Sequence, residues 1–239
     1  MSPELEIGWF GKLPSSGDFA FRRIPRTLLD ELDNWLSRGL VQYRIAMPGD
    51  WREHFAAAPL WNFAIPGCVA GGNTLIGLLV PSRDRVGREF PLCAGVVLPP
   101  DAATNQLLAD VPEWLWSLGQ VVVEARDRVL PLDEFDAIVR TIPLPPASKR
   151  VAPTTGANDI LDILGLGPID APTVPMPLAH AVPWPELPTI FDAEKPTSFW
   201  WTNPGAGRAL SGFTTDAGLA PTLLIRLMGP STPGGGNRS

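Results

Sequence analysis

The sequence has few of the side chains on which enzymes and metal sites most often rely. Its 239 residues include two cysteines, Cys68 and Cys93, and two histidines, His54 and His180. Both cysteines lie in apolar runs, so we expect buried, reduced thiols rather than a single bridge or a reactive group. The four residues show no short metal-ligand spacing, and the histidines are expected at surface or capping positions. No metal ion and no cofactor is therefore predicted.

Basic charge is also scarce. Nineteen Lys and Arg stand against 25 Asp and Glu, a net charge of -6. This balance argues against nucleic acid as a partner, because neutralising phosphates needs a basic surface. The first residues contain Glu4 and Glu6 where a signal peptide needs positive charge. No apolar run approaches the roughly 18 residues of a membrane span. A reducing cytoplasm is the expected location.

Common catalytic motifs are missing as well. No Gly-x-Ser-x-Gly pentad occurs, so the sequence lacks the nucleophile elbow of acyl-transfer enzymes. The segment Gly8–Leu13 superficially resembles the end of a phosphate-binding loop, but it has leucine where that loop needs a hydroxyl and Glu6 where it needs glycine. Acidic pairs at helical spacing are interpreted as solvated helix faces: Asp30 with Asp33, Asp133 with Asp136, and Asp159 with Asp162.

Hydrophobic periodicity predicts an α/β protein. Apolar stripes indicate helices over 27–46, 105–128 and 132–142 and a shorter one over 50–58, with Thr27 as an N-cap and Pro112 as a point that splits the third helix or begins another. Strands are predicted over 5–10, 61–65, 74–80 and 90–98. The runs 75–80 and 93–98 are continuously apolar, which favours central strands covered on both faces. We expect a three-layer α/β/α sandwich with a central mixed sheet and helices on both faces.

The second half of the chain is rich in proline. Residues 143–204 contain 13 prolines in 62 positions, which favours an extended segment, and enough apolar residues to wrap the body of the domain. Within it, 198–202 reads as a returning strand that places Trp200 and Trp201 on opposite faces and pairs with 207–213. Residues 222–228 fit either a strand or a short helix. We expect one α/β domain over 1–228 and a disordered tail over 229–239.

Two charged segments do not fit a purely structural pattern. Gly11–Phe19 carries Lys12 and Asp18 near its ends, and Pro81–Leu92 places five charges in seven residues between two apolar strands: Arg83, Asp84, Arg85, Arg88 and Glu89. In one interpretation the arginines fix the loop by pairing with Asp84, Glu89 or Asp18. In the other they form a recognition surface for an acidic partner or a phosphate group.

Four segments at ordered separations carry a family resemblance: Gly8–Phe19, Trp35–Leu40, Pro59–Phe63 and Pro81–Leu92. Their residues resemble the TagF family of accessory proteins of bacterial type VI secretion. The match is dense over the first hundred residues and loose beyond Ile142, where Ser198–Trp201 is the best correspondence. The resemblance implies a three-layer α/β/α fold and a cytoplasmic, non-enzymatic repressor of secretion, which acts through a forkhead-associated scaffold protein.

The family resemblance brings no catalytic residues and implies no small-molecule substrate. Our own hypothesis assigns partner binding to residues of the two charged segments: Lys12, Asp18, Arg83, Asp84, Arg85 and Arg88. The alternative is an enzyme or nucleotide binder that holds a phosphorylated ligand with the same residues. A structural component of the secretion apparatus is the third reading.

Overall fold

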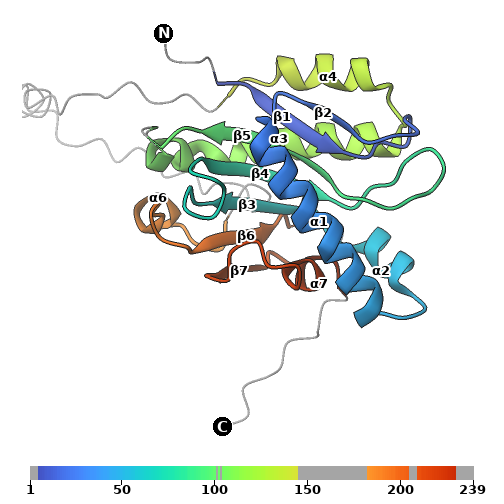
Figure 1. Cartoon of the computed structure of the whole chain (residues 1–239). Coiled ribbons are helices and arrows are strands. Elements are labelled where there is room, and N and C mark those ends of the chain that lie inside the picture. Colours follow the sequence, from blue (N-terminus) through green and yellow to red (C-terminus); the bar gives the residue numbers. More distant parts are fainter. Residues whose placement is uncertain (1–4, 101, 103, 145–181, 205–208, 230–239) are drawn as a thin grey trace, which may run out of the picture.

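A computed structural model of the chain describes residues 5–100, 102, 104–144, 182–204 and 209–229 (Figure 1). Its centre is a seven-stranded sheet in the order β2-β1-β5-β4-β3-β6-β7. The strands are β1 (Ile7–Gly11), β2 (Ala20–Arg22), β3 (Trp61–Ile65), β4 (Thr74–Val80), β5 (Leu92–Leu98), β6 (Ser198–Thr202) and β7 (Gly212–Thr215). The helices are α1 (Arg26–Ala46), α2 (Trp51–Ala57), α3 (Thr104–Asp127), α4 (Leu132–Thr141), α6 (Leu187–Ile190) and α7 (Leu223–Met228). The predicted α/β class is confirmed.

The predicted mixed sheet is wrong, because every neighbouring pair of strands is antiparallel. Antiparallel strands usually alternate apolar and polar residues, because one face meets solvent. Here every residue of β3 and β4 is buried, so the continuous apolar runs reflect coverage of both faces rather than parallel pairing.

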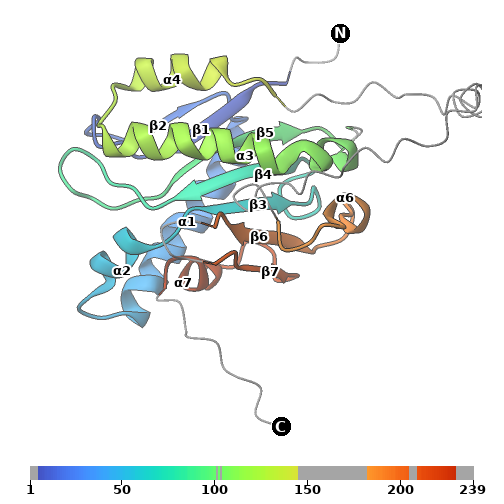
Figure 2. The ribbon, with the colours of Figure 1, turned by 180° about the vertical axis from the view of Figure 1, so that it is seen from behind.

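Each face of the sheet carries its own hydrophobic cluster. On one face, Ile76, Leu78 and the other inward residues pack with side chains of α3, α4 and α6. On the opposite face, Leu75 and Leu79 pack with α1, α2 and α7. Figure 1 shows α1 in front of the sheet, and Figure 2, seen from behind, shows α3 crossing the other face. The strands are therefore buried between two groups of helices.

Trp200 and Trp201 lie on opposite faces of β6, as predicted. The Trp200 ring packs near Trp35 and Phe63, whereas Trp201 belongs to the cluster around α3 and contacts Trp184. Both side chains are buried, with exposed fractions of 0% and 1%. Neither indole is available at the surface, so this pair serves the core.

Several local predictions are settled by the structure. α1 begins at Arg26 after Pro25, so the prediction of Thr27 as its N-cap is wrong. Pro112 lies inside one continuous helix, α3. The 222–228 segment forms the helix α7. β6 pairs with a later strand as predicted, but β7 overlaps only the end of the predicted 207–213 stretch. Most of the proline-rich segment, His180, the Asp159 and Asp162 pair and the tail from 230 lie outside the described residues.

The strand β2 was not predicted from the sequence. It has three residues and follows the Gly11–Phe19 turn, pairing Arg22 with Trp9 across the edge of the sheet. A run this short carries no periodicity of its own, so its conformation depends on pairing with β1.

The two cysteines differ. Cys93 lies in β5 and is buried, which raises the pKa of its thiol well above the usual value. Cys68 is exposed, so the prediction of a buried thiol is wrong there. It follows β3 in a run of turns, where its neighbours no longer alternate into the core. No helix in the described part of the chain is long and apolar enough to cross a membrane.

Asp136 of α4 is buried, against the prediction of a solvated face. Its Oδ1 accepts hydrogen bonds from Trp9 Nε1 at 2.7 Å and from Arg23 Nη2 at 2.6 Å, and Oδ2 accepts one from Arg23 Nη1 at 3.0 Å. Burial alone would raise the pKa of this carboxyl, but the Arg23 and Trp9 hydrogen bonds and the nearby positive charges lower it to about 2. Arg140 lies 3.2 Å from Oδ2. The contacts of Asp136 with Trp9 and Arg23 fasten α4 to β1 and to the residue that follows β2.

This geometry predicts a pH-dependent contribution to stability. The carboxyl of Asp136 titrates at about 2 in the folded chain, against roughly 3.9 when unfolded. Its stabilisation, roughly 2 kcal/mol, is therefore present above about pH 4 and is lost as pH falls toward 2. We expect Asp136→Asn to remove this part of the decline. The free energy of unfolding is measured by denaturant titration across this pH range.

Asp133→Asn is the matched control, because the Asp133 side chain is 97% exposed. If the Asp136→Asn variant loses stability with falling pH as steeply as the wild-type chain does, the assignment of the effect to this carboxyl is wrong.

Candidate interaction site at the charged strand connection

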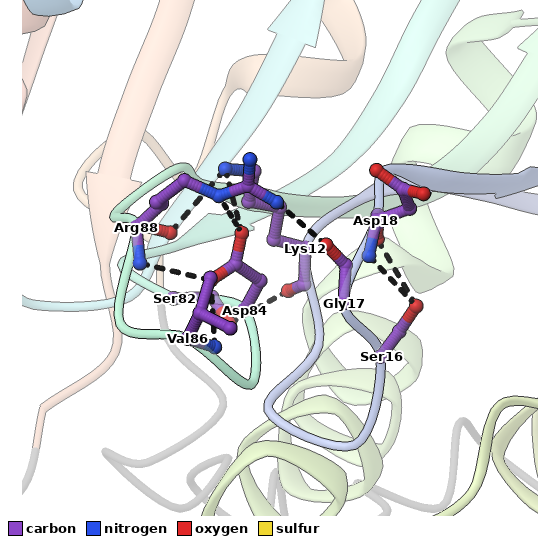
Figure 3. Close-up of polar contacts among 8 residues, drawn as sticks. All are labelled: Lys12, Ser16, Gly17, Asp18, Ser82, Asp84, Val86 and Arg88. Carbon is purple, nitrogen blue, oxygen red and sulfur yellow. Dashed lines mark hydrogen bonds and ion pairs between the residues drawn. The ribbon is translucent and has the colours of Figure 1, made fainter.

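The two charged segments meet at one end of the sheet (Figure 3). β1 ends at Gly11 opposite Leu92 of β5, and β4 ends at Val80 opposite the same residue. The connections that follow β1 and β4 are therefore neighbours. Arg85 N donates to Ser16 O at 2.8 Å, and Ser82 Oγ donates to Lys12 O at 2.7 Å.

The carboxylate of Asp84 lies at the centre of this site. Its side chain has no exposed surface. Oδ1 accepts hydrogen bonds from the amides of Val86 at 3.1 Å and Arg88 at 2.9 Å. Oδ2 lies 3.0 Å from Lys12 Nζ and 2.6 Å from Arg88 Nε. One buried carboxylate therefore joins the backbone of its own loop to the segment after β1.

The electrostatics of this site keep Asp84 ionised. Burial alone would raise its pKa, but the Arg88 amide, the Lys12 ammonium and the Arg88 guanidinium together lower it well below the ordinary aspartate value. A buried charge is tolerated only when it is paired and hydrogen-bonded. The Asp84 carboxylate meets this condition through its two amide and two cationic donors.

The loop around Asp84 is folded tightly on itself. Gly87 N donates to Asp84 O at 3.0 Å, and Gly87 has a φ of +83°, which only glycine adopts readily. Asp84 N also donates to Arg88 O at 3.1 Å. The Arg88 side chain also contacts the segment after β1, where its Nη2 donates to Gly17 O at 2.6 Å. Arg88 is therefore a structural part of the loop, although its side chain is 59% exposed.

The other predicted site residues are not held in this way. Asp18 is exposed, and its carboxylate makes no ion pair with any residue that the structure describes. Arg83 and Arg85 are exposed, and within the described ranges no hydrogen bond or ion pair engages either guanidinium group. Glu89 pairs with Arg52 of α2 at 3.1 Å instead. Lys12, Asp84 and Arg88 thus fix the loop, whereas Arg83 and Arg85 face outward.

Two further arginines adjoin the site, Arg52 and Arg126, and neither was predicted from the sequence. A cleft of about 700 Å³ lies beside the loop, and its lining includes Arg52, Arg83 and Arg126 together with Glu53, Glu89 and Asp127. Arg126 Nη1 donates to Pro81 O at 3.2 Å and its Nε lies 2.7 Å from Asp127. These residues come from α2 and the end of α3, so no local motif signalled them. Planar guanidinium groups of this kind suit carboxylate or phosphate oxygens.

The residues that the structure describes contain no group of three or more His, Cys, Asp or Glu side chains placed to hold a metal ion. The chemistry on offer at this site is therefore that of guanidinium donors around one buried anion.

We expect Asp84→Ala to loosen the loop. The change removes the shared acceptor of two amides and two cations and lowers the free energy of unfolding by roughly 3 kcal/mol. Amide hydrogen exchange at Val86 and Arg88 is expected to quicken by about tenfold or more. Both are measured by denaturant titration and by exchange mass spectrometry at neutral pH.

Asp18→Ala serves as the control, since Asp18 is an exposed acid on the neighbouring segment. Equal protection of the 84–90 amides in the Asp84→Ala and wild-type chains would show that Asp84 does not hold the loop.

Comparison with solved structures finds a close overall match. The crystal structure of PA0076 from Pseudomonas aeruginosa PAO1 superposes with a TM-score of 0.68 at 25% sequence identity, over 96% of this chain and 99% of that one. No curated protein matches significantly.

The family comparison covers the part of the chain that builds the site. The model described as the TagF N-terminal domain, type VI secretion system-associated, matches residues 8–142. This stretch is more than half of the 239 residues and runs from the second residue of β1 through α4, including Lys12, Asp84 and Arg88. The chain therefore belongs to the TagF family of type VI secretion system-associated proteins.

Proposed function

We propose that this chain is a non-enzymatic cytoplasmic regulator that restrains type VI secretion by protein contact, and that its partner is the forkhead-associated scaffold protein of the system. Membership of a secretion-associated family supports the process. The contact would be made at one end of a framework that we interpret as a three-layer α/β/α sandwich. The charged loop between β4 and β5 would supply the recognition residues.

The exposure of Arg83 and Arg85 on a fixed loop is the observation that carries this proposal. Asp84, between them in sequence, is tied down by four donors. The loop backbone therefore does not need to be ordered when a partner binds, and preorganisation of this kind lowers the entropic cost of association. Exposed guanidinium groups favour an acidic partner surface because they can bind carboxylates with two parallel hydrogen bonds.

The charge balance of the site supports a protein partner over a phosphorylated small molecule. Lys12 and Arg88 already share the Asp84 carboxylate. In the adjacent cleft, three arginines are accompanied by three acids, Glu53, Glu89 and Asp127, which would repel a phosphate group. Of the four cations that the alternative function requires, Lys12 and Arg88 are thus paired within the chain, and the cleft beside Arg83 has no excess of positive charge.

Reversing one exposed charge on the loop tests the proposal. We expect Arg83→Glu and Arg85→Glu, each alone, to weaken binding of the purified scaffold protein by about tenfold or more, as for loss of one well-placed ion pair across an interface. Secretion should rise when either variant replaces the wild-type chain in cells. Binding is measured by titration calorimetry, and circular dichroism checks the fold.

Lys195→Glu is the matched control. Lys195 is 72% exposed and follows α6, which Figure 1 places at the opposite end of the sheet from the loop. Its reversal makes the same change in net charge and should leave binding intact. If the wild-type chain does not bind the scaffold and its deletion does not raise secretion, the proposed function is wrong.

A nucleotide panel tests the alternative. A ligand at about 100 times its dissociation constant adds about 2.7 kcal/mol to the stability of the folded state. We expect the melting temperature to stay unchanged with nucleoside mono-, di- and triphosphates and with inorganic phosphate. A rise with one of them that disappears in Arg83→Glu would favour a phosphate-binding function.

A further inference from the structure

A second feature lies on the other side of the same loop. A groove of about 500 Å³ separates the loop tip from α1 and α2. Val86, Gly87 and Arg88 form one wall, and Val41, Arg44 and Trp51 lie on the helical side. The loop wall is the part fixed by Asp84, because the amides of Val86 and Arg88 both donate to its carboxylate. The groove therefore has a defined shape without a ligand.

The groove is positively charged in a chain whose net charge is -6. Its lining includes four cationic side chains, Lys12, Arg44, Arg52 and Arg88, and one acid, Glu89. Glu89 pairs with Arg52, and Lys12 and Arg88 share Asp84. Four positive charges therefore stand against two negative ones, an excess of two. This excess attracts anions although the whole chain repels them.

Arg44 is the cation in this groove that no acid compensates. Its guanidinium carbon lies 4.4 Å from the centre of the Trp51 ring, and it forms no ion pair within the described part of the chain. Stacking on an indole fixes the plane of the guanidinium group but leaves its N–H donors free for an anion. The arrangement presents a positioned donor beside an aromatic surface.

Exposed apolar side chains gather at the same place. Val41 is 55% exposed and Ile45, one turn further along α1, is 72% exposed. Val86 on the loop is 67% exposed. Large apolar residues exposed to this degree are few in the described chain. Val41 and Val86 line the groove and Ile45 lies one turn beyond Val41, and such a grouping is typical of an interaction surface. An occupant must therefore supply apolar side chains as well as negative charge.

We propose that this groove is the docking site for an acidic segment of the partner protein that also carries apolar side chains. The carboxylates of the segment would bind Arg44 and the exposed face of Arg88, and its apolar residues would cover Val41, Ile45 and Val86. This inference rests on the proposed function and extends it, because it names the chemistry of the partner segment and a surface on α1 in addition to Arg83 and Arg85.

A protein segment fits these observations better than a membrane surface. The site is a groove rather than a convex basic patch, and its net excess is two charges. Membrane attraction of about 1 kcal/mol per basic residue would need a larger cluster to hold a chain of net charge -6. A short peptide segment, by contrast, brings its carboxylates into direct contact with the two arginines.

The test measures the binding of the full-length variants Val41→Asp and Arg44→Glu to the purified scaffold protein. We expect both to bind about tenfold more weakly than the wild-type chain. Ile190→Asp and Lys195→Glu, at the α6 end, are the matched apolar and basic controls and should bind normally; Ile190 is 44% exposed. A photo-reactive benzoylphenylalanine at position 41 should then crosslink to a scaffold peptide in which Asp and Glu outnumber Lys and Arg, and one at position 190 should not.

The outcomes separate the two proposals. If the wild-type chain binds the scaffold and folded Val41→Asp and Arg44→Glu bind it equally well, the groove proposal is wrong and the proposed function stands. If the wild-type chain does not bind the scaffold, both fall. A crosslink from position 41 to a basic or neutral peptide overturns the predicted chemistry. Sedimentation with phosphatidylglycerol vesicles that is lost in Arg44→Glu would assign the groove to a membrane instead.

Discussion

The buried carboxylate of Asp84 determines the shape of the charged surface at the end of the sheet. Two backbone amides and two cations converge on its oxygens, and these donors come from the loop itself and from the segment after β1. The loop between β4 and β5 consequently has one conformation, and the direction of its exposed side chains follows from that conformation. The outward direction of Arg83 and Arg85 and the groove beside Val86 share this single origin.

A second buried carboxylate, Asp136, performs a comparable task beside β1. Asp136 joins α4 to Trp9 of β1 and to Arg23, whereas Asp84 joins the β4–β5 loop to Lys12 just beyond the end of β1. Both acids are ionised although buried, because each has several hydrogen-bond donors. The two carboxylates thus attach α4 and the β4–β5 loop to β1 and the residue that follows it, in a sheet that is otherwise stabilised by apolar packing on its two faces.

Sequence patterns predicted the elements better than their arrangement. β3 and β4 have the predicted bounds, because largely apolar runs that end before Pro66 and Pro81 leave little choice. Such runs carry no information on strand direction, so the antiparallel order could not be read from them. The two charged segments were identified, but not the central role of Asp84. Asp136 was missed because its partner Arg23 is 113 positions away and helical spacing alone suggested a solvated face.

The separation between residues that hold the loop and residues that face outward has an evolutionary consequence. The side chains of Arg83 and Arg85 contribute no hydrogen bond or ion pair to the framework over the described residues, whereas the side chain of Asp84 between them contributes several. Exchange of the outward pair for other side chains would therefore leave the scaffold of the loop intact. A chain built in this way can change its binding preference in small steps, each of which costs little folding stability.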